Sequence, residues 1–249
     1  MSCGWIRRIK KQRYALGERE RVDIVRDFYE NYYSRVFSNK GLSSIFNSLT
    51  HKKLESNYIH NKINTDKKFT VMEIGAGQGE HIKYVKHSYS SYLMVDIIPH
   101  PDLSNIPAKA DWQTVDFCEK KINLGTFDRI ISTCVFHHLD DPVTAIENVK
   151  KHLKPGGTFS LFLPSDPGIL NRLLRKICVT PSVGKLGFKH YEVVNAREHK
   201  NHYWSLKTNL DFQFKGYEIT KKYYPINIPL GNFSLFSIWQ IKSKCSGCQ

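Results

Sequence analysis

The stretch VMEIGAGQGEH, residues 71–81, has the clearest capacity for chemistry in this sequence. Gly75, Gly77 and Gly79 directly follow an apolar run, and glycines at such a point allow a tight turn and a close approach of a ligand to the backbone. A dinucleotide site would show G-x-G-x-x-G, whereas here the third glycine comes one residue early. We expect a helix over EHIKYVKHS to begin at once, with its free amides facing that ligand.

Acidic residues end the next two apolar runs. Asp96 closes SYLMVDI, where a carboxylate can hold both hydroxyls of a ribose. Asp116 and Phe117 close WQTVDF, and they pair an acid with an apolar ring, which suits the amino group and the face of an adenine. If these runs are parallel strands, all of these features fall on one edge of a sheet, which is where open α/β sheets bind ligands.

The surrounding pattern supplies such a sheet. Five runs predict strands: FTVMEIG, SYLMVDI, WQTVDF, FDRIISTCVF and TFSLFLP. A helix is predicted over DPVTAIENVKKHLKPGG, with clear stop signals at its end. Residues 18–60 have a helical pattern, a largely helical insert runs to about residue 207, and YEITKKYYP and LFSIWQIK predict two closing strands. Strands that alternate with helices indicate a parallel sheet covered on both faces.

Composition excludes several classes of protein. The 249 residues are 41% hydrophobic and 24% charged, which indicates a globular chain, and no apolar run approaches the ~20 residues of a membrane span. The net charge is +14, carried by basic flanks over 1–68 and 165–249 around a nearly neutral middle. Such flanks favour an anionic partner. The six scattered cysteines indicate a reducing compartment, and Cys245 and Cys248 are interpreted as part of a frayed tail.

Together, E-x-G-x-G-x-G, the acid after the second strand, D-F after the third, the turn H-H-L and the run L-K-P-G-G resemble the class I S-adenosylmethionine-dependent methyltransferases. Within them the chain resembles the large group that acts on small molecules. The resemblance covers residues 69–164. It implies a Rossmann-like, seven-stranded, mostly parallel sheet with one antiparallel closing strand. It also implies an N-terminal helical lid over 1–68 and a methyltransferase domain over 69–249, with its helical insert at about 165–207.

The resemblance assigns the cofactor, S-adenosyl-L-methionine, to the edge described above. Glu73 and the glycine turn then hold the methionine part, Asp96 holds the ribose, and Asp116 with Phe117 frames the adenine. Backbone groups of Thr133 and Cys134 line the floor. The complete set of expected cofactor contacts is Glu73, Gly75, Ala76, Gly77, Gly79, Asp96, Ile97, Asp116, Phe117, Thr133 and Cys134.

A second cluster, AREHKNHY at residues 196–203, leaves three interpretations open. If the segment is helical, Glu198 and His202 share a face as an acid–base dyad. It could instead be half of a metal site or a solvated helix face; we expect no metal, because no third and fourth ligand adjoins. The resemblance builds the acceptor pocket from the lid and the insert. The expected catalytic residues are His202, His138 and Arg197, and the expected acceptor contacts are Tyr32, Tyr33, Arg197, His199, His202, Tyr203 and His137.

The predicted function is therefore methyl transfer to an oxygen of a small anionic acceptor, a sugar nucleotide or a phosphorylated compound. A loose resemblance of the insert to methyltransferases of bacterial cell-surface polysaccharide pathways favours that role, in the cytoplasm. The alternatives are an RNA methyltransferase and a quinone or carboxylate methyltransferase. RNA is the less expected partner because no separate binding domain is visible. A lipid acceptor would require a more apolar insert.

Overall fold

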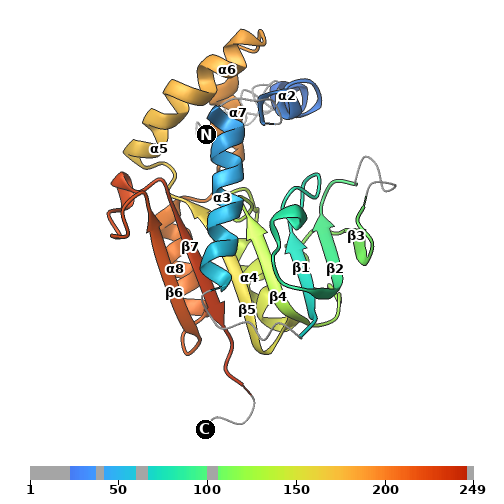
Figure 1. The fold of residues 1–249 in the computed structure, drawn as a ribbon. Helices are drawn as coiled ribbons and strands as arrows, with labels where there is room; N and C mark the ends of the chain where they lie inside the picture. Colours follow the sequence, from blue (N-terminus) through green and yellow to red (C-terminus); the bar gives the residue numbers. More distant parts are fainter. Residues whose placement is uncertain (1–22, 38–41, 60–66, 100–105, 246–249) are drawn as a thin grey trace, which may run out of the picture. The chain divides into compact units, whose positions relative to one another are not determined.

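The computed structural model describes residues 23–37, 42–59, 67–99 and 106–245 (Figure 1). The chain divides into two compact units. Unit 1 comprises Met1–Asn47 and Leu173–His199, and unit 2 comprises Ser48–Arg172 and Lys200–Gln249. The helix α3 (Leu42–Ile59) is divided between them, because its residues from Ser48 onward belong to the same unit as the sheet. The expected boundary at residue 68 stays a prediction.

Unit 2 is built on one seven-stranded sheet in the order β3-β2-β1-β4-β5-β7-β6. The strands are β1 (Phe69–Ile74), β2 (Tyr89–Asp96), β3 (Ala110–Thr114), β4 (Phe127–Thr133), β5 (Leu153–Pro164), β6 (Glu218–Tyr224) and β7 (Phe236–Lys242). The first five run parallel, and β7 is antiparallel to both of its neighbours, β5 and β6. The predicted mostly parallel sheet with one antiparallel strand is confirmed. The carboxyl ends of β1–β6 therefore share one edge, called here the carboxyl edge.

Two helices cover one face of the sheet, and the part of α3 that belongs to unit 2 crosses the other (Figure 1). The helix α4 (Pro142–His152) begins at Asp141, whose carboxylate accepts hydrogen bonds from the amides of Val143 and Thr144. Such a cap satisfies amides that have no partner inside the helix. α4 and α8 (Tyr203–Gln213) bury apolar side chains against the sheet: Ala145, Ile146, Val149, Leu206 and Leu210 pack with Met72, Ile74, Ile130 and Leu161.

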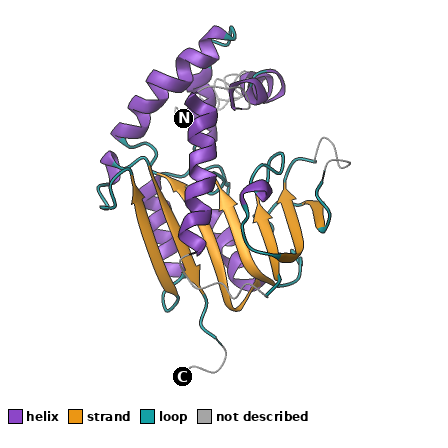
Figure 2. Ribbon diagram, viewed as in Figure 1, coloured by secondary structure: helices purple, strands orange, loops and turns teal. Residues whose placement is uncertain are grey.

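The helix expected directly after β1 is not formed. Only a short 3₁₀ turn, η1 (Ile82–Tyr84), stands between β1 and β2 (Figure 2). His81 precedes this turn, and its side chain is completely buried and hydrogen-bonded to Glu55 of α3. This long-range contact outweighs the local helical pattern of EHIKYVKHS. The prediction that a helix N-terminus presents its amides to the ligand is wrong.

Unit 1 joins two segments that lie far apart in the sequence. Its helices α2 (Tyr33–Phe37), α6 (Thr180–Lys185) and α7 (Tyr191–Glu198) come from the N-terminal region and from the insert. α5 (Ile169–Leu174) begins in unit 2 and leads through a π-helical turn, Arg175–Val179, into α6. The two segments share a core of Phe28, Val36, Val183, Phe188 and Val194. No helix among the described residues has the length and apolar character that crossing a membrane requires.

Candidate cofactor and acceptor site

The glycine turn after β1 is held tightly against its neighbours. The amides of Gly75 and Ala76 both donate to the carbonyl of Val95 on β2, and Gly75 has a positive φ of 66°. A Cβ on Gly75 would lie 2.2 Å from a methyl carbon of Val135, in the turn after β4. Only glycine satisfies both constraints here, because L side chains rarely adopt this backbone conformation. The turn after β1 and the turn after β4 are therefore packed on each other.

Gly77 is the open point of the same turn. Its φ is +61°, and a Cβ placed there would meet nothing within 4 Å. Its amide donates to Asp96 Oδ2 at 2.9 Å, while Asp96 Oδ1 accepts from the amide of Ile98 at 3.0 Å. A carboxylate has about four acceptor positions, so Asp96 keeps capacity for two hydroxyl donors. The cradle thus leaves space for a ligand beside Gly77 and an acceptor for a ribose.

The loop after β3 is held in place by hydrogen bonds within it and from α4. Asp116 accepts a hydrogen bond from the amide of Cys118 at 2.8 Å, and the ring of Phe117 is buried in the core. Asn148 of α4 donates to the carbonyls of Phe117 and Glu119, each at 2.9 Å. Asn148 could not be predicted to contact this loop, because a lone asparagine inside an amphipathic helix carries no signal of its partner.

The remaining expected cofactor residues lie at or near the same edge. Thr133 ends β4, and Cys134 follows it with a positive φ of 58°. Non-glycine residues in this conformation are strained, and such strain concentrates at functional sites. Ile97 follows β2 and is 64% exposed.

Glu73 occupies a different environment from the one expected. It is 1% exposed, and the hydroxyl of Tyr92 donates to its carboxylate at 2.7 Å. Burial raises the pKa of Glu73, since removal from water disfavours the charged form. Glu73 lies in β1, just before the glycine turn, and its side chain is on the sheet face that α3 crosses. Its contact with the methionine part of the cofactor stays a prediction.

A buried ionic cluster lies on that same face. Arg129 of β4 donates from both terminal nitrogens to the two carboxylate oxygens of Glu55, at 3.1 and 2.7 Å. His81 Nε2 lies 3.0 Å from Glu55 Oε1, and the side chains of all three residues are fully buried. Arg129 and the hydrogen bond from His81 hold the pKa of Glu55 well below its usual range, against the opposing effect of burial. α3 is thereby bound to β4 and to the residue that follows the glycine turn.

Two further histidines extend this cluster. His51 Nδ1 lies 2.8 Å from His81 Nδ1, and burial lowers the pKa of His51 to about 3. His87 Nε2 lies 3.0 Å from an Arg129 nitrogen, and because a guanidinium only donates, His87 accepts there and is neutral. Burial, with the charge of Arg129, lowers the pKa of His87 to about 4. The cluster could not be predicted from the sequence, because its residues lie on four separate segments.

The segment AREHKNHY is not one helix. α7 ends at Glu198, and α8 begins at Tyr203 with His202 as its N-cap in an extended conformation. The conditional expectation that Glu198 and His202 stack on one helical face is therefore wrong. The helix is interrupted because Lys200 and Asn201 bind the turn after β4.

Lys200 and Asn201 attach the segment to the turn after β4. Lys200 Nζ lies 2.6 Å from Asp140 Oδ1. The side chain of Asn201 donates to the carbonyls of Phe136 at 3.3 Å and Leu139 at 2.6 Å, and its amide donates to the carbonyl of His137 at 3.0 Å. His202, which follows, is exposed. Asn201 therefore holds the H-H-L turn and places His202 beside the carboxyl edge of the sheet.

The other expected acceptor residues are distributed over both units. Tyr32, Tyr33, Arg197 and His199 belong to unit 1, where Tyr32 packs on Phe188 with ring centroids 5.0 Å apart. His137, His138, His202 and Tyr203 belong to unit 2. The rings of His137 and His138 lie 3.9 Å apart. Tyr203 is buried in the core under the sheet, so we assign it a packing role. Cys248 lies outside the described residues.

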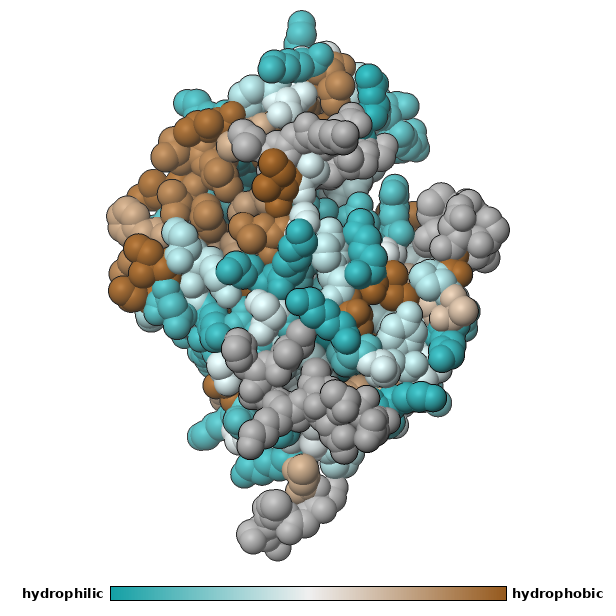
Figure 3. Space-filling view, in the orientation of Figure 1, coloured by the Kyte–Doolittle hydropathy of each residue, from teal (hydrophilic) through white to brown (hydrophobic). Residues whose placement is uncertain are grey.

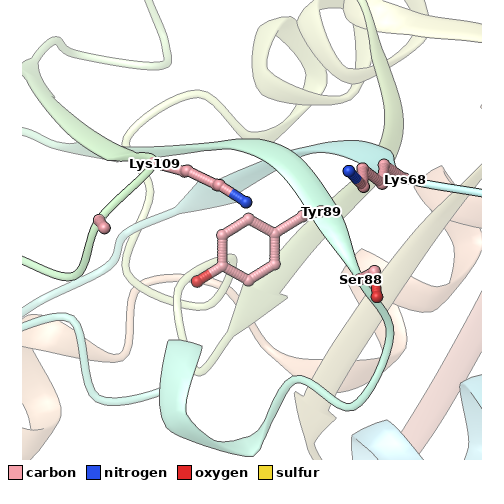
Figure 4. A pocket seen from close by; sticks show the side chains of 5 residues that line it. Lys68, Ser88, Tyr89 and Lys109 are labelled. Atoms are coloured by element: carbon pink, nitrogen blue, oxygen red, sulfur yellow. The ribbon is translucent and has the colours of Figure 1, made fainter.

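An open pocket lies at the opposite edge of the sheet. Its lining residues are Lys68, Ser88, Tyr89, Ala108 and Lys109, and Lys109 points toward the ring of Tyr89 (Figure 4). These residues precede or begin β1, β2 and β3. The pocket is therefore separate from the carboxyl edge and from the glycine turn.

Comparisons with known proteins agree with this geometry. Residues 72–159 match the family model described as a methyltransferase domain. A search of curated proteins gave no significant match. The plantazolicin methyltransferase BpumL, crystallised with a monoazolic desmethylPZN analog and S-adenosylhomocysteine, superposes with a TM-score of 0.60 at 12% identity, over 91% of this chain and 99% of that one.

Two further solved structures share the fold. The N-methyltransferase NodS from Bradyrhizobium japonicum WM9, with S-adenosylhomocysteine bound, gives a TM-score of 0.54 at 15% identity, over 84% of this chain and 95% of that one. The 1,6-didemethyltoxoflavin-N1-methyltransferase from Burkholderia thailandensis gives 0.54 at 12% identity, over 93% and 90%. The domain match over residues 72–159 supports a class I S-adenosylmethionine-dependent methyltransferase with S-adenosylmethionine as its cofactor, and the solved structures share the fold of its seven-stranded sheet.

Proposed function

We propose that this methyltransferase acts on an oxygen of a small anionic acceptor, a sugar nucleotide or a phosphorylated compound, in cell-surface polysaccharide biosynthesis in the cytoplasm. The observation that carries the acceptor assignment is the position of His202. It is exposed, and it follows directly on Asn201, which is bonded to the turn after β4 at the carboxyl edge.

The cofactor side of the proposal uses the glycine turn and the acids at the strand ends. Gly77 leaves space beside the backbone, Asp96 receives the ribose hydroxyls, and Asp116 receives the adenine amino group. The bound cofactor supplies a methyl group on a positively charged sulfur. The task of the chain is then mainly to align the acceptor with that methyl group and to exclude water.

His202 would take the proton of a hydroxyl acceptor as the methyl group transfers. A positioned base contributes roughly 100–10,000-fold. With a phosphate oxygen as acceptor no proton has to leave, and His202 would orient the anion instead. Arg197 of the insert stays a predicted contact for an anionic acceptor, since a guanidinium is a planar cation. His138, in the turn after β4, is the second candidate for contact with the acceptor.

Basic flanks support an anionic acceptor, since residues 165–249 contain 13 Lys and Arg against 5 Asp and Glu. The same charge would suit RNA. Transfer to nitrogen is one alternative, and the solved structures that share the fold include N-, C- and O-methyltransferases by name. A quinone or carboxylate acceptor is the other alternative.

The test measures formation of S-adenosylhomocysteine with sugar nucleotides, phosphorylated sugars, transfer RNA and a quinone precursor. We expect turnover with the first two groups. Turnover with RNA alone, or with the quinone precursor alone, would refute the proposal. With the active acceptor, His202→Asn should slow the chemical step strongly, while His190→Asn, at another exposed histidine, should not. If His202→Asn leaves both turnover and the Michaelis constant intact, His202 has no role in the acceptor site.

A further inference from the structure

The loop between β6 and β7 presents an unusual surface. In this loop, residues 225–235, large apolar side chains point into solvent: Ile226 is 60% exposed, Ile228 49%, Leu230 46% and Phe233 61%. Folded chains seldom leave several large apolar groups together in water unless they bind something. Brown, hydrophobic side chains gather over this loop in Figure 3.

The backbone of the loop holds these side chains outward. The amide of Ile228 donates to the carbonyl of Ile226 at 2.7 Å, and the amide of Leu230 donates to the carbonyl of Ile228 at 2.8 Å. These two consecutive tight turns repeat every two residues along the loop. The polar side chain between them turns back, since Asn227 Oδ1 accepts from the amide of Tyr223 on β6 at 3.0 Å. The side chain of Asn227 is thus hydrogen-bonded to β6, while the apolar side chains of the loop face the solvent.

Two neighbouring elements enlarge this surface. Trp204, 53% exposed, packs against Gly231, where a Cβ would lie 2.4 Å from the indole. Ile169, 56% exposed, begins α5, and the preceding Gly168 packs against the backbone of Asn232. We call these residues together the apolar rim: Ile169, Trp204, Ile226, Ile228, Leu230 and Phe233. Its core lies in a loop that follows the carboxyl end of β6, at the same edge of the sheet as Asp96 and the glycine turn.

Two cations lie near the apolar rim. Lys53 Nζ lies 5.5 Å from the ring of Tyr224 at the end of β6, and Arg172 is exposed in the first turn of α5. The loop itself, residues 225–235, contains no charged residue. Apolar side chains on a projecting loop with cations at its base match the interface of a bilayer, where apolar groups enter the acyl boundary and cations meet anionic headgroups.

We propose that the apolar rim docks the enzyme on an anionic lipid surface, with the carboxyl edge of the sheet turned toward the membrane. A protein partner fits less well, because Ile and Leu dominate the rim, whereas protein interfaces draw their binding energy mainly from Trp, Tyr and Arg. The docking is independent of the identity of the acceptor, so it stands or falls separately from the proposed function.

The experiment is flotation of the full chain, without acceptor, with vesicles of phosphatidylcholine alone and of phosphatidylcholine with phosphatidylglycerol at roughly three to one. We expect flotation with the anionic vesicles only. Ile228→Glu combined with Phe233→Glu should weaken it by about tenfold or more, because charged groups are excluded from the acyl boundary. Phe212→Glu is the matched control, since Phe212 is 75% exposed elsewhere on α8 and should have no effect. Arg172→Gln should weaken binding to the anionic vesicles.

Calorimetry with S-adenosylhomocysteine checks that each variant is folded. The proposal is overturned if the wild type fails to float with anionic vesicles, or if the double variant floats as well as the wild type. It is also overturned if light scattering shows a dimer that the double variant dissociates, because the apolar rim would then be covered by a second copy of the chain.

Discussion

Arg129 on β4 and Glu55 on α3 form a two-pronged ion pair with both side chains completely buried, although 74 residues separate them in the sequence. The stacked ring of Tyr58, with its centroid 3.7 Å from the Arg129 guanidinium carbon, covers the pair. The same carboxylate meets His81, directly after the glycine turn. The pair therefore connects the N-terminal helix, the centre of the sheet and the cofactor turn.

Breaking this pair should destabilise the protein strongly. Glu55→Gln leaves the charge of Arg129 buried without its counterion, which typically costs about 3–5 kcal/mol. Urea unfolding of the full chain measures the loss. Glu55→Leu combined with Arg129→Met removes both charges and should recover most of the stability. Equal unfolding midpoints for Glu55→Gln and the wild type would show that the pair contributes nothing.

Stability should also fall in mild acid. The pKa of His87 is about 4 in the folded chain, against 6.5 as its ordinary value. As pH falls from 6.5 the unfolded chain binds a proton that the folded chain does not, so the contribution is complete above 6.5 and is lost toward pH 4. His51, with a pKa of about 3, acts in the same direction.

His87→Gln tests this directly. A glutamine oxygen can accept from Arg129 as the neutral imidazole does, but it does not titrate. The free energy of unfolding, measured between pH 6.5 and 4.5, should depend less steeply on pH in this variant than in the wild type. An unchanged slope would assign the acid sensitivity to other groups.

Removing the carboxylate of Asp96 should weaken cofactor binding. Asp96→Ala deletes the expected ribose acceptor and frees the amide of Gly77, and hydrogen bonds to a charged acceptor contribute about 1.5–3 kcal/mol. Calorimetric titration with S-adenosylmethionine measures the change. Asp111→Ala, at an exposed acid on the neighbouring β3, serves as the control. If the two variants bind equally well, the ribose assignment is wrong.

The two glycines of the turn should differ in their response to alanine. At Gly77 the new methyl group has free space, so only the positive φ opposes it, at about 1–2 kcal/mol. At Gly75 the same strain is joined by a contact of 2.2 Å with Val135. We expect Gly75→Ala to lose markedly more stability than Gly77→Ala in thermal unfolding, and Val135→Ala to restore part of the difference. Equal losses would mean that the turn after β4 moves freely.

That residues 1–68 form a lid stays a prediction, and its test is a deletion that leaves the core of unit 2 intact. His51, Leu54 and Glu55 are buried in unit 2, so a deletion through residue 60 would remove part of the core. A deletion that ends at residue 47 preserves these contacts. It should keep cofactor affinity and lose turnover. Normal turnover in this shortened chain would exclude a lid.

Local pattern predicted the positions of the strands and of the candidate cofactor residues that follow them. Most of the strands are apolar or β-branched runs, and the glycine turn, Asp96 and Asp116 lie at or just after the ends of such strands, so neighbouring residues carried the information. The order of these runs then placed their ends on one edge, since parallel strands share a direction. The closing strands, near Tyr224 and Phe236, were also correctly located.

Tertiary structure decided the features that depend on distant partners. The helix predicted after β1 gave way to the contact between His81 and Glu55, and the segment AREHKNHY was divided when Asn201 bonded to the turn after β4. The outward direction of Ile226 and Ile228 likewise follows from the folded loop. In each case the deciding interaction joins residues whose separation in the sequence carries no periodic signal, so only the folded chain brings them together.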